Sequence, residues 1–150
     1  MEVARTLISG GAEIAYDEAH ASSELNSAAR LGDLDKISML LEGGCDADTQ
    51  DYDARTCLHV AAWGGQLQVV KALLDFGANA NLRDRLSCTP LADAVRSKYY
   101  EVCRVLIKHG ATLGFEESKQ ADELCELARV GDLEGVRMLL LAGCNVNAAD

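Results

Sequence analysis

The chain has 150 residues, of which 49% are hydrophobic and 25% charged, and this composition allows one folded domain with an ordinary core. Its net charge of −10 argues against nucleic acid as a partner, because that binding depends on clustered Lys and Arg. No stretch approaches the roughly 20 apolar residues of a membrane span. The N-terminus MEVARTLISGG also lacks the basic start and apolar core of a signal peptide. We therefore expect no membrane contact and a cytoplasmic location.

The cysteines point the same way. They form no Cys-x-x-Cys pair, and no Cys or His residues stand at a spacing typical of zinc. We expect no metal, no cofactor and reduced thiols. The six cysteines are Cys45, Cys57, Cys88, Cys103, Cys125 and Cys144.

The predicted elements follow a fixed period along the chain. The segment TCLHVAAWGGQLQVVKALLDFGANAN begins at Thr56, and TPLADAVRSKYYEVCRVLIKHGATL begins 33 residues later at Thr89. Self-similarity at a fixed spacing indicates a repeat array. One column of this register contains only glycine: Gly11, Gly44, Gly77, Gly110 and Gly143.

Each unit contains the signals of two short helices. Ser23, Thr56, Thr89 and Asp122 share a column of residue types that cap helix N-termini, so they should begin the first helix of each unit. Glycines such as Gly65 end that helix, and the leucines and valines of LQVVKALLD form a second helix, which Gly77 terminates. These signals predict a half unit at 1–22 and repeats at about 23–51, 52–84, 85–121 and 122–150.

At DYDARTCLHVAAWGGQLQVVKALLDFGANANLRD the sequence resembles the ankyrin-repeat family, whose consensus contains D-x-x-G-x-T-P-L-H-x-A-A and V-V-x-x-L-L-x-x-G-A. The resemblance covers about residues 3–150. It implies an all-α solenoid of about four stacked helix-turn-helix units plus an N-terminal half unit. The departures are Ala54 and Ser87 where the turn usually has Gly, Cys57 for Pro and Ala92 for His, and they concern local turn geometry.

A second, longer period spans three repeats. The loops EIAYDEAHASS (13–23) and TLGFEESKQAD (112–122) lack the D-x-x-G turn and lie in register 99 residues apart. The pattern begins inside a second helix and stops before the next turn, so we expect either a fragment of a longer array or an engineered truncation. Leu141 stands in an otherwise polar column, so it is either covered by something at that end or a tolerated exposed leucine.

The pair Cys57 and His59 is not expected to be catalytic, because residues two apart on a helix point in different directions. The resemblance implies instead that His59, with Thr56, hydrogen-bonds the backbone of a neighbouring turn. We find no other catalytic pattern and expect no enzyme.

Repeat proteins bind partners on extended surfaces, and the resemblance implies contacts at the turns and at the ends of the first helices. At the helix ends, one column reads Arg, Trp, Arg, Arg, an expected positive stripe that could hold an acidic or carboxylate-bearing protein segment. The alternative is that these arginines only stabilise helix C-termini. The candidate binding residues are Arg30, Tyr52, Asp53, Arg55, Trp63, Arg85, Leu86, Arg96 and Arg129.

The sequence therefore predicts a non-enzymatic protein-protein interaction module. A regulatory or oligomerising tail, self-associating through the terminal repeat near Leu141, is the alternative. Segments of this sequence are also similar to the ankyrin tails of lysophospholipase/asparaginase enzymes, glutaminases and plant voltage-gated potassium channels.

Overall fold

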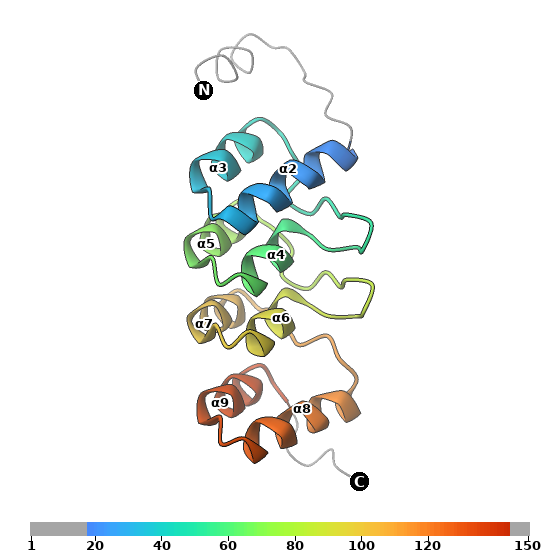
Figure 1. The fold of residues 1–150 in the computed structure, drawn as a ribbon, viewed down its shortest axis with the longest axis vertical. Helices are drawn as coiled ribbons and strands as arrows, with labels where there is room; N and C mark the ends of the chain where they lie inside the picture. The colour runs from blue at the N-terminus through green and yellow to red at the C-terminus, as the bar shows by residue number, and fades with distance from the viewer. Residues whose placement is uncertain (1–17, 145–150) are drawn as a thin grey trace.

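The computed structural model describes residues 18–144, and in that range the chain forms eight helices and no strands (Figure 1). The helices pair into hairpins that stack in one column, with the first helix of each pair in one layer and the second helix in the other. This confirms the expected all-α repeat solenoid. The helices are α2 (Glu18–Leu31), α3 (Leu34–Glu42), α4 (Cys57–Trp63), α5 (Leu67–Asp75), α6 (Pro90–Arg96), α7 (Tyr100–Lys108), α8 (Glu117–Arg129) and α9 (Leu133–Leu141).

One continuous core runs through the stack. Leu58 and Leu91, at equivalent places of α4 and α6, are fully buried, as are Leu73 and Leu106 of α5 and α7. The small residues beside them, such as Ala61, are also fully buried. Small side chains let neighbouring helices approach closely, so α4 packs against both α2 and α6.

The starts of two helices differ from the prediction. We expected α2 to begin at Ser23 and α8 at Asp122, but they begin at Glu18 and Glu117. The five residues directly before each expected cap contain no Gly or Pro, and Glu, Ala, Lys and Gln are good helix formers, so each helix extends by more than a turn at its N-terminus. The predicted half unit 1–22 therefore contributes its last residues to α2, and the rest of it lies outside the described residues.

Of the two predicted threonine caps, Thr56 forms a capping box with His59 at the start of α4, whereas Thr89 does not cap α6. Thr89 makes no side-chain bond to its own helix, and its hydroxyl donates instead to the carbonyl of Thr112 in the next connection, at 2.6 Å. Two second helices also have side-chain caps, where Asp33 and Asp132 accept backbone N–H bonds at 3.0 Å. Thr89 thus joins neighbouring units rather than capping α6.

The two turns that lack the family's glycine keep the glycine conformation. Ala54 has a φ of 58° and Ser87 a φ of 62°, both in the left-handed region that side chains disfavour. The substitutions noted in the sequence therefore leave the turn geometry in place and add local strain to it.

Candidate functional site

Each of the two projecting turns is held by one aspartate. Asp51 Oδ1 accepts the backbone N–H groups of Asp53 and Arg55, both at 2.9 Å. Asp84 does the same in the next unit, accepting N–H groups two and four residues further along at 2.9 and 2.8 Å. An aspartate that bonds its own backbone in this way fixes a tight turn. The side chains on both turns are therefore presented by a defined backbone.

The tips of the two turns are joined to each other. The backbone N–H of Arg85 donates to the carbonyl of Asp53 at 2.8 Å, and the side chains of this pair lie 3.7 Å apart as an ion pair. Tyr52 and Leu86, beside them, are 84% and 74% exposed. The tips form one surface with two apolar side chains directed outward to solvent.

A hollow of about 300 Å³ lies between these tips and the ends of the inner helices. It brings together six of the nine predicted binding residues. They are Asp53, Arg55, Trp63, Arg85, Leu86 and Arg96, and the remaining lining residues are Asp84, Cys88 and Asp93.

The charges of the hollow balance, with three arginines and three aspartates, but they differ in depth. Arg85 and Arg96 are exposed, whereas Asp93 is only 7% exposed and forms an ion pair with Arg55 at 3.3 Å. Burial raises the pKa of Asp93, and the nearby Arg55 guanidinium opposes that rise. Arg85 and Arg96 are therefore the most exposed charges of the hollow, Asp53 is partly exposed beside Arg85 at the tip, and Asp93 lies deepest.

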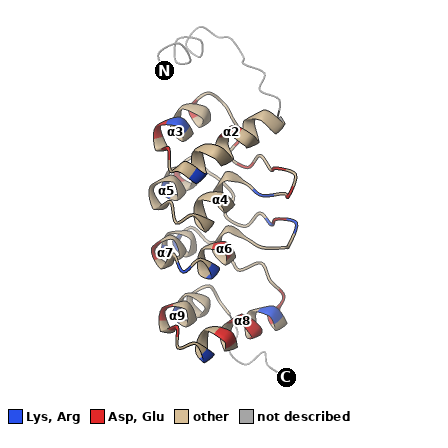
Figure 2. Ribbon diagram, viewed as in Figure 1, with Lys and Arg blue, Asp and Glu red and all other residues tan. Residues whose placement is uncertain are grey.

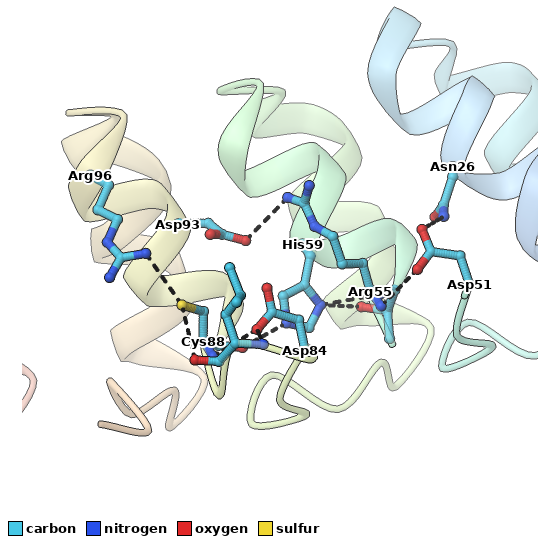
Figure 3. Close-up of polar contacts among 10 residues, drawn as sticks. Asn26, Asp51, Arg55, His59, Asp84, Cys88, Asp93 and Arg96 are labelled. Carbon is cyan, nitrogen blue, oxygen red and sulfur yellow. Dashed lines mark hydrogen bonds and ion pairs between the residues drawn. The ribbon is translucent and has the colours of Figure 1, made fainter. Parts of the chain in front are cut away.

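Arg96 differs from the other arginines of the hollow. Its Nη1 donates to the Sγ of Cys88 at 3.3 Å, and its guanidinium lies 5.2 Å from the ring centroid of Phe115 (Figure 3 shows the contact with Cys88). Within residues 18–144 no ion pair joins Arg96 to a carboxylate. Its charge is exposed and is not neutralised by direct contact.

Three predicted residues lie outside the hollow. Arg30 and Arg129 occupy the last turns of α2 and α8, where Figure 2 shows basic residues at the helix ends, and Tyr52 lies at a turn tip. Arg129 pairs with Glu126 of its own helix at 2.6 Å. The expected positive stripe is thus neutralised by a carboxylate at one end and unpaired, among the described residues, at Arg96 and Arg30.

His59 is fully buried and has a structural role. Its Nδ1 accepts the backbone N–H of Thr56 at 3.2 Å, so Nε2 carries the proton and donates to the carbonyl of Cys88 at 3.1 Å (Figure 3). Burial lowers the pKa of His59. Cys57 faces away toward the carbonyl of Ala47, and burial raises its pKa to about 12. The imidazole therefore joins two turns, as the resemblance implied, and the Cys57 thiol does not contact it.

Three groups that could ligate a metal meet in the hollow, an arrangement that sequence spacing did not predict. Ligand atoms of Asp84, Cys88 and Asp93 all lie within 4.8 Å of one another. The guanidinium of Arg55 already contacts Asp93, and that of Arg96 contacts Cys88. Asp93 and Cys88 therefore already accept from two cations of the protein itself, and Asp84 accepts backbone N–H groups of its own turn.

A family model for ankyrin repeats, in three copies, matches residues 25–116, more than half of the chain. The chain belongs to the ankyrin-repeat family. Ankyrin repeats act in general as protein-binding units that use extended surfaces rather than enclosed active sites. A search of curated proteins gave no match to this ankyrin array. Between residues 18 and 144, no helix has the length and apolar character needed to cross a bilayer.

Sequence reasoning missed three side chains of this site in the ankyrin array. Asp84 had a signal, because it repeats Asp51 at the 33-residue spacing. Asp93 had none, since it reaches Arg55 from 38 residues away, whereas Phe115 had a weak one, because Tyr16 precedes it by the 99-residue period.

Proposed function

We propose that this ankyrin array is a non-enzymatic binding module that takes an extended segment of a partner protein across its inner helices and turn tips. The observation that supports this most is Trp63, which is 58% exposed beside the hollow. Exposing a large aromatic ring to water brings no stability, whereas Trp and Arg are enriched where binding energy concentrates. Leu86 and Tyr52 extend the exposed apolar surface along the tips.

The partner segment that suits this surface carries acidic side chains. Arg85 and Arg96 are exposed while Asp93 lies below them, so a carboxylate that approaches from solvent meets cations first. Arginine binds carboxylates through paired N–H donors, which gives orientation as well as affinity. Apolar neighbours of that carboxylate would then pack against Trp63.

The test is capture of a partner from a lysate by the wild type and by a Trp63→Ala/Arg96→Ala variant. We expect the wild type to retain a protein that the variant loses, with helicity equal by circular dichroism. A matched control replaces an exposed aromatic and an exposed cation of the outer helix layer, Phe76→Ala/Lys71→Ala, and should retain the partner. Equal capture by all three proteins would contradict the proposed site.

A second candidate is self-association through α9, as part of a regulatory or oligomerising tail. Leu140 and Leu141 are 43% and 59% exposed. Leu41 occupies the place of Leu140 in the earlier three-repeat block and is only 9% exposed, because α5 packs on α3 there. A surface that the array covers in one block is thus open in the other.

Light scattering over a range of protein concentrations tests this second candidate. Self-association through α9 predicts a mass that rises with concentration in the wild type and less so in Leu141→Glu. A constant monomer mass would rule self-association out.

The proposal that this array is a tail of a larger enzyme or channel rests on sequence similarity alone. The described cysteines are all unpaired, which supports the proposed cytoplasmic location.

A further inference from the structure

We propose that Arg96 is the residue that binds a partner carboxylate, and that Phe115 is a positioning residue that holds Arg96 ready for it. This rests on the proposed function and narrows it to one anchor. The ligand is an aspartate or glutamate side chain of an extended peptide segment. The anchor depends on a connection, 109–116, that lacks the projecting turn of the neighbouring units.

Arg96 has N–H donors that remain available to a ligand. Arg55 and Arg85 each form an ion pair with an aspartate of the hollow. Arg96 instead gives one N–H to the sulfur of Cys88, and sulfur is a weak acceptor. A guanidinium has five N–H donors in a planar fork, so donors remain for a carboxylate to accept from two at once.

The aromatic ring of Phe115 lies in a fixed position against the Arg96 guanidinium. Phe115 is partly buried and packs against the core, and its carbonyl accepts a bond from the side chain of Gln120 at 2.7 Å. The loop that carries the ring is therefore tied to the first turn of α8. A ring below the guanidinium attracts the cation through its face and leaves the N–H edge open. Because the long side chain is already ordered, binding loses less conformational entropy.

The guanidinium of Arg96 is accessible from two hollows. Arg96 lines the 300 Å³ hollow on one side and a smaller hollow of about 150 Å³ on the other, which Phe115, Lys119, Asp122 and Glu123 also line. A carboxylate therefore has room to approach the guanidinium edge. Asp84 and Asp93 lie deeper in the larger hollow and would repel a doubly charged phosphate more than a singly charged carboxylate.

The sequence contains a parallel to this arrangement. Tyr16 stands 99 residues before Phe115, so an aromatic residue recurs at the same place of the three-repeat block, in the second of the two loops without the D-x-x-G turn. The loss of the projecting turn thus coincides with the presence of an aromatic ring at both places in the sequence.

Trp63 is the only tryptophan of the chain and lines the same hollow as Arg96, so its fluorescence reports binding there. The probes are a short blocked peptide of alternating alanine and glutamate and its glutamine counterpart. We expect the wild-type protein to bind the glutamate peptide at least roughly tenfold more tightly, as one charge-assisted contact allows. Arg96→Gln should remove this preference, and Arg129→Gln, the matched control, should keep it.

Phe115→Leu should lower the preference for glutamate several-fold while the affinity for the glutamine peptide stays unchanged, with only a modest fall in melting temperature from the lost packing. Phe115→Tyr should retain the preference, since it keeps the ring. A loss of fold would lower the affinity for both peptides and the melting temperature together. A wild-type preference in Phe115→Leu would show that the ring does not position Arg96.

Equal affinity for the two peptides, or no saturable fluorescence change with either, would overturn the carboxylate anchor. The proposed function has a separate outcome. If partner capture still depends on Trp63 while the peptides bind equally, the module binds protein without this anchor. If capture is unaffected by Trp63→Ala and the glutamate preference is present, the anchor stands and the groove-wide binding function fails.

Discussion

Replacing Ala54 and Ser87 by glycine should stabilise the protein. Both residues hold the left-handed backbone of the projecting turns, with φ of 58° and 62°. Their N–H groups donate to the carbonyls of Asp51 and Asp84, both at 2.9 Å, so the turn cannot relax without breaking these bonds. Ser87 is exposed and Ala54 half-buried, so the loss of their side chains removes little packing.

The expected gain is a difference between two effects. A left-handed conformation costs a residue with a Cβ about 1–2 kcal/mol. Glycine removes this cost, but it also makes the unfolded chain more flexible. That flexibility lowers the stability of the folded protein by about 0.4–1 kcal/mol and offsets part of the gain. Each substitution should therefore stabilise by about 0.5–1 kcal/mol, and both together by about 1–2 kcal/mol. For a chain of this size that corresponds to a melting temperature higher by roughly 2–8 °C.

Urea denaturation followed by circular dichroism measures the gain directly. Lys98→Gly is the matched control, because Lys98 has the same φ of 62° but its ammonium pairs with Asp132 at 3.3 Å. Glycine there relieves strain and loses the ion pair, so its net gain should be smaller. If Ala54→Gly and Ser87→Gly lower stability, the turns do not hold this backbone in solution and the reasoning is refuted.

Three further predictions concern buried side chains. Burial lowers the pKa of His59 in the folded protein, so the contribution of the neutral imidazole to stability is complete above about pH 6.5. This contribution is lost as the pH falls below that value, by up to about 1.4 kcal/mol per pH unit. Urea denaturation between pH 7.5 and 5.5 should show that the unfolding free energy depends less steeply on pH in His59→Gln than in the wild type. Cys125 is exposed and should react with a thiol reagent long before Cys57, whose pKa is raised to about 12; equal rates in the folded protein would contradict the burial of Cys57. Leu106→Ala, at a fully buried position, should cost about 2–5 kcal/mol of unfolding free energy, and a cost well below that would indicate a loosely packed stack.

The sequence predicted the regular units well, because their signals are local. A capping residue, a run of small and large apolar residues and a terminal glycine lie within one unit, and the period repeats them. The helix starts at Glu18 and Glu117 were missed because Ser23 and Asp122 suit a cap as well as a helix interior. A cap residue predicts a helix start only where the residues before it cannot be helical, as at Thr56, where the backbone forms a tight turn.

The site was predicted in part. The 33-residue period placed Trp63 and Arg96 at equivalent helix ends, and both residues line the hollow. It could not show which arginines are neutralised, since the partner of Arg55 lies 38 residues away and enters from the next helix. Electrostatic pairing between units depends on side-chain length and direction. The column therefore indicated a continuous positive stripe, whereas Arg129 is neutralised by Glu126 and, of the column's arginines, only Arg30 and Arg96 have no ion pair among the described residues.

The two long inner helices, α2 and α8, lie three units apart with the pair of projecting turns between them (Figure 1). An array that repeats this block would carry the proposed binding hollow at intervals of three units, about 25–30 Å at the usual spacing of packed helices. Single sites of modest affinity at such a fixed spacing favour a ligand with recurring motifs, because the second contact forms at a high effective concentration. The block length would then set the spacing of motifs that the array selects in a multivalent partner.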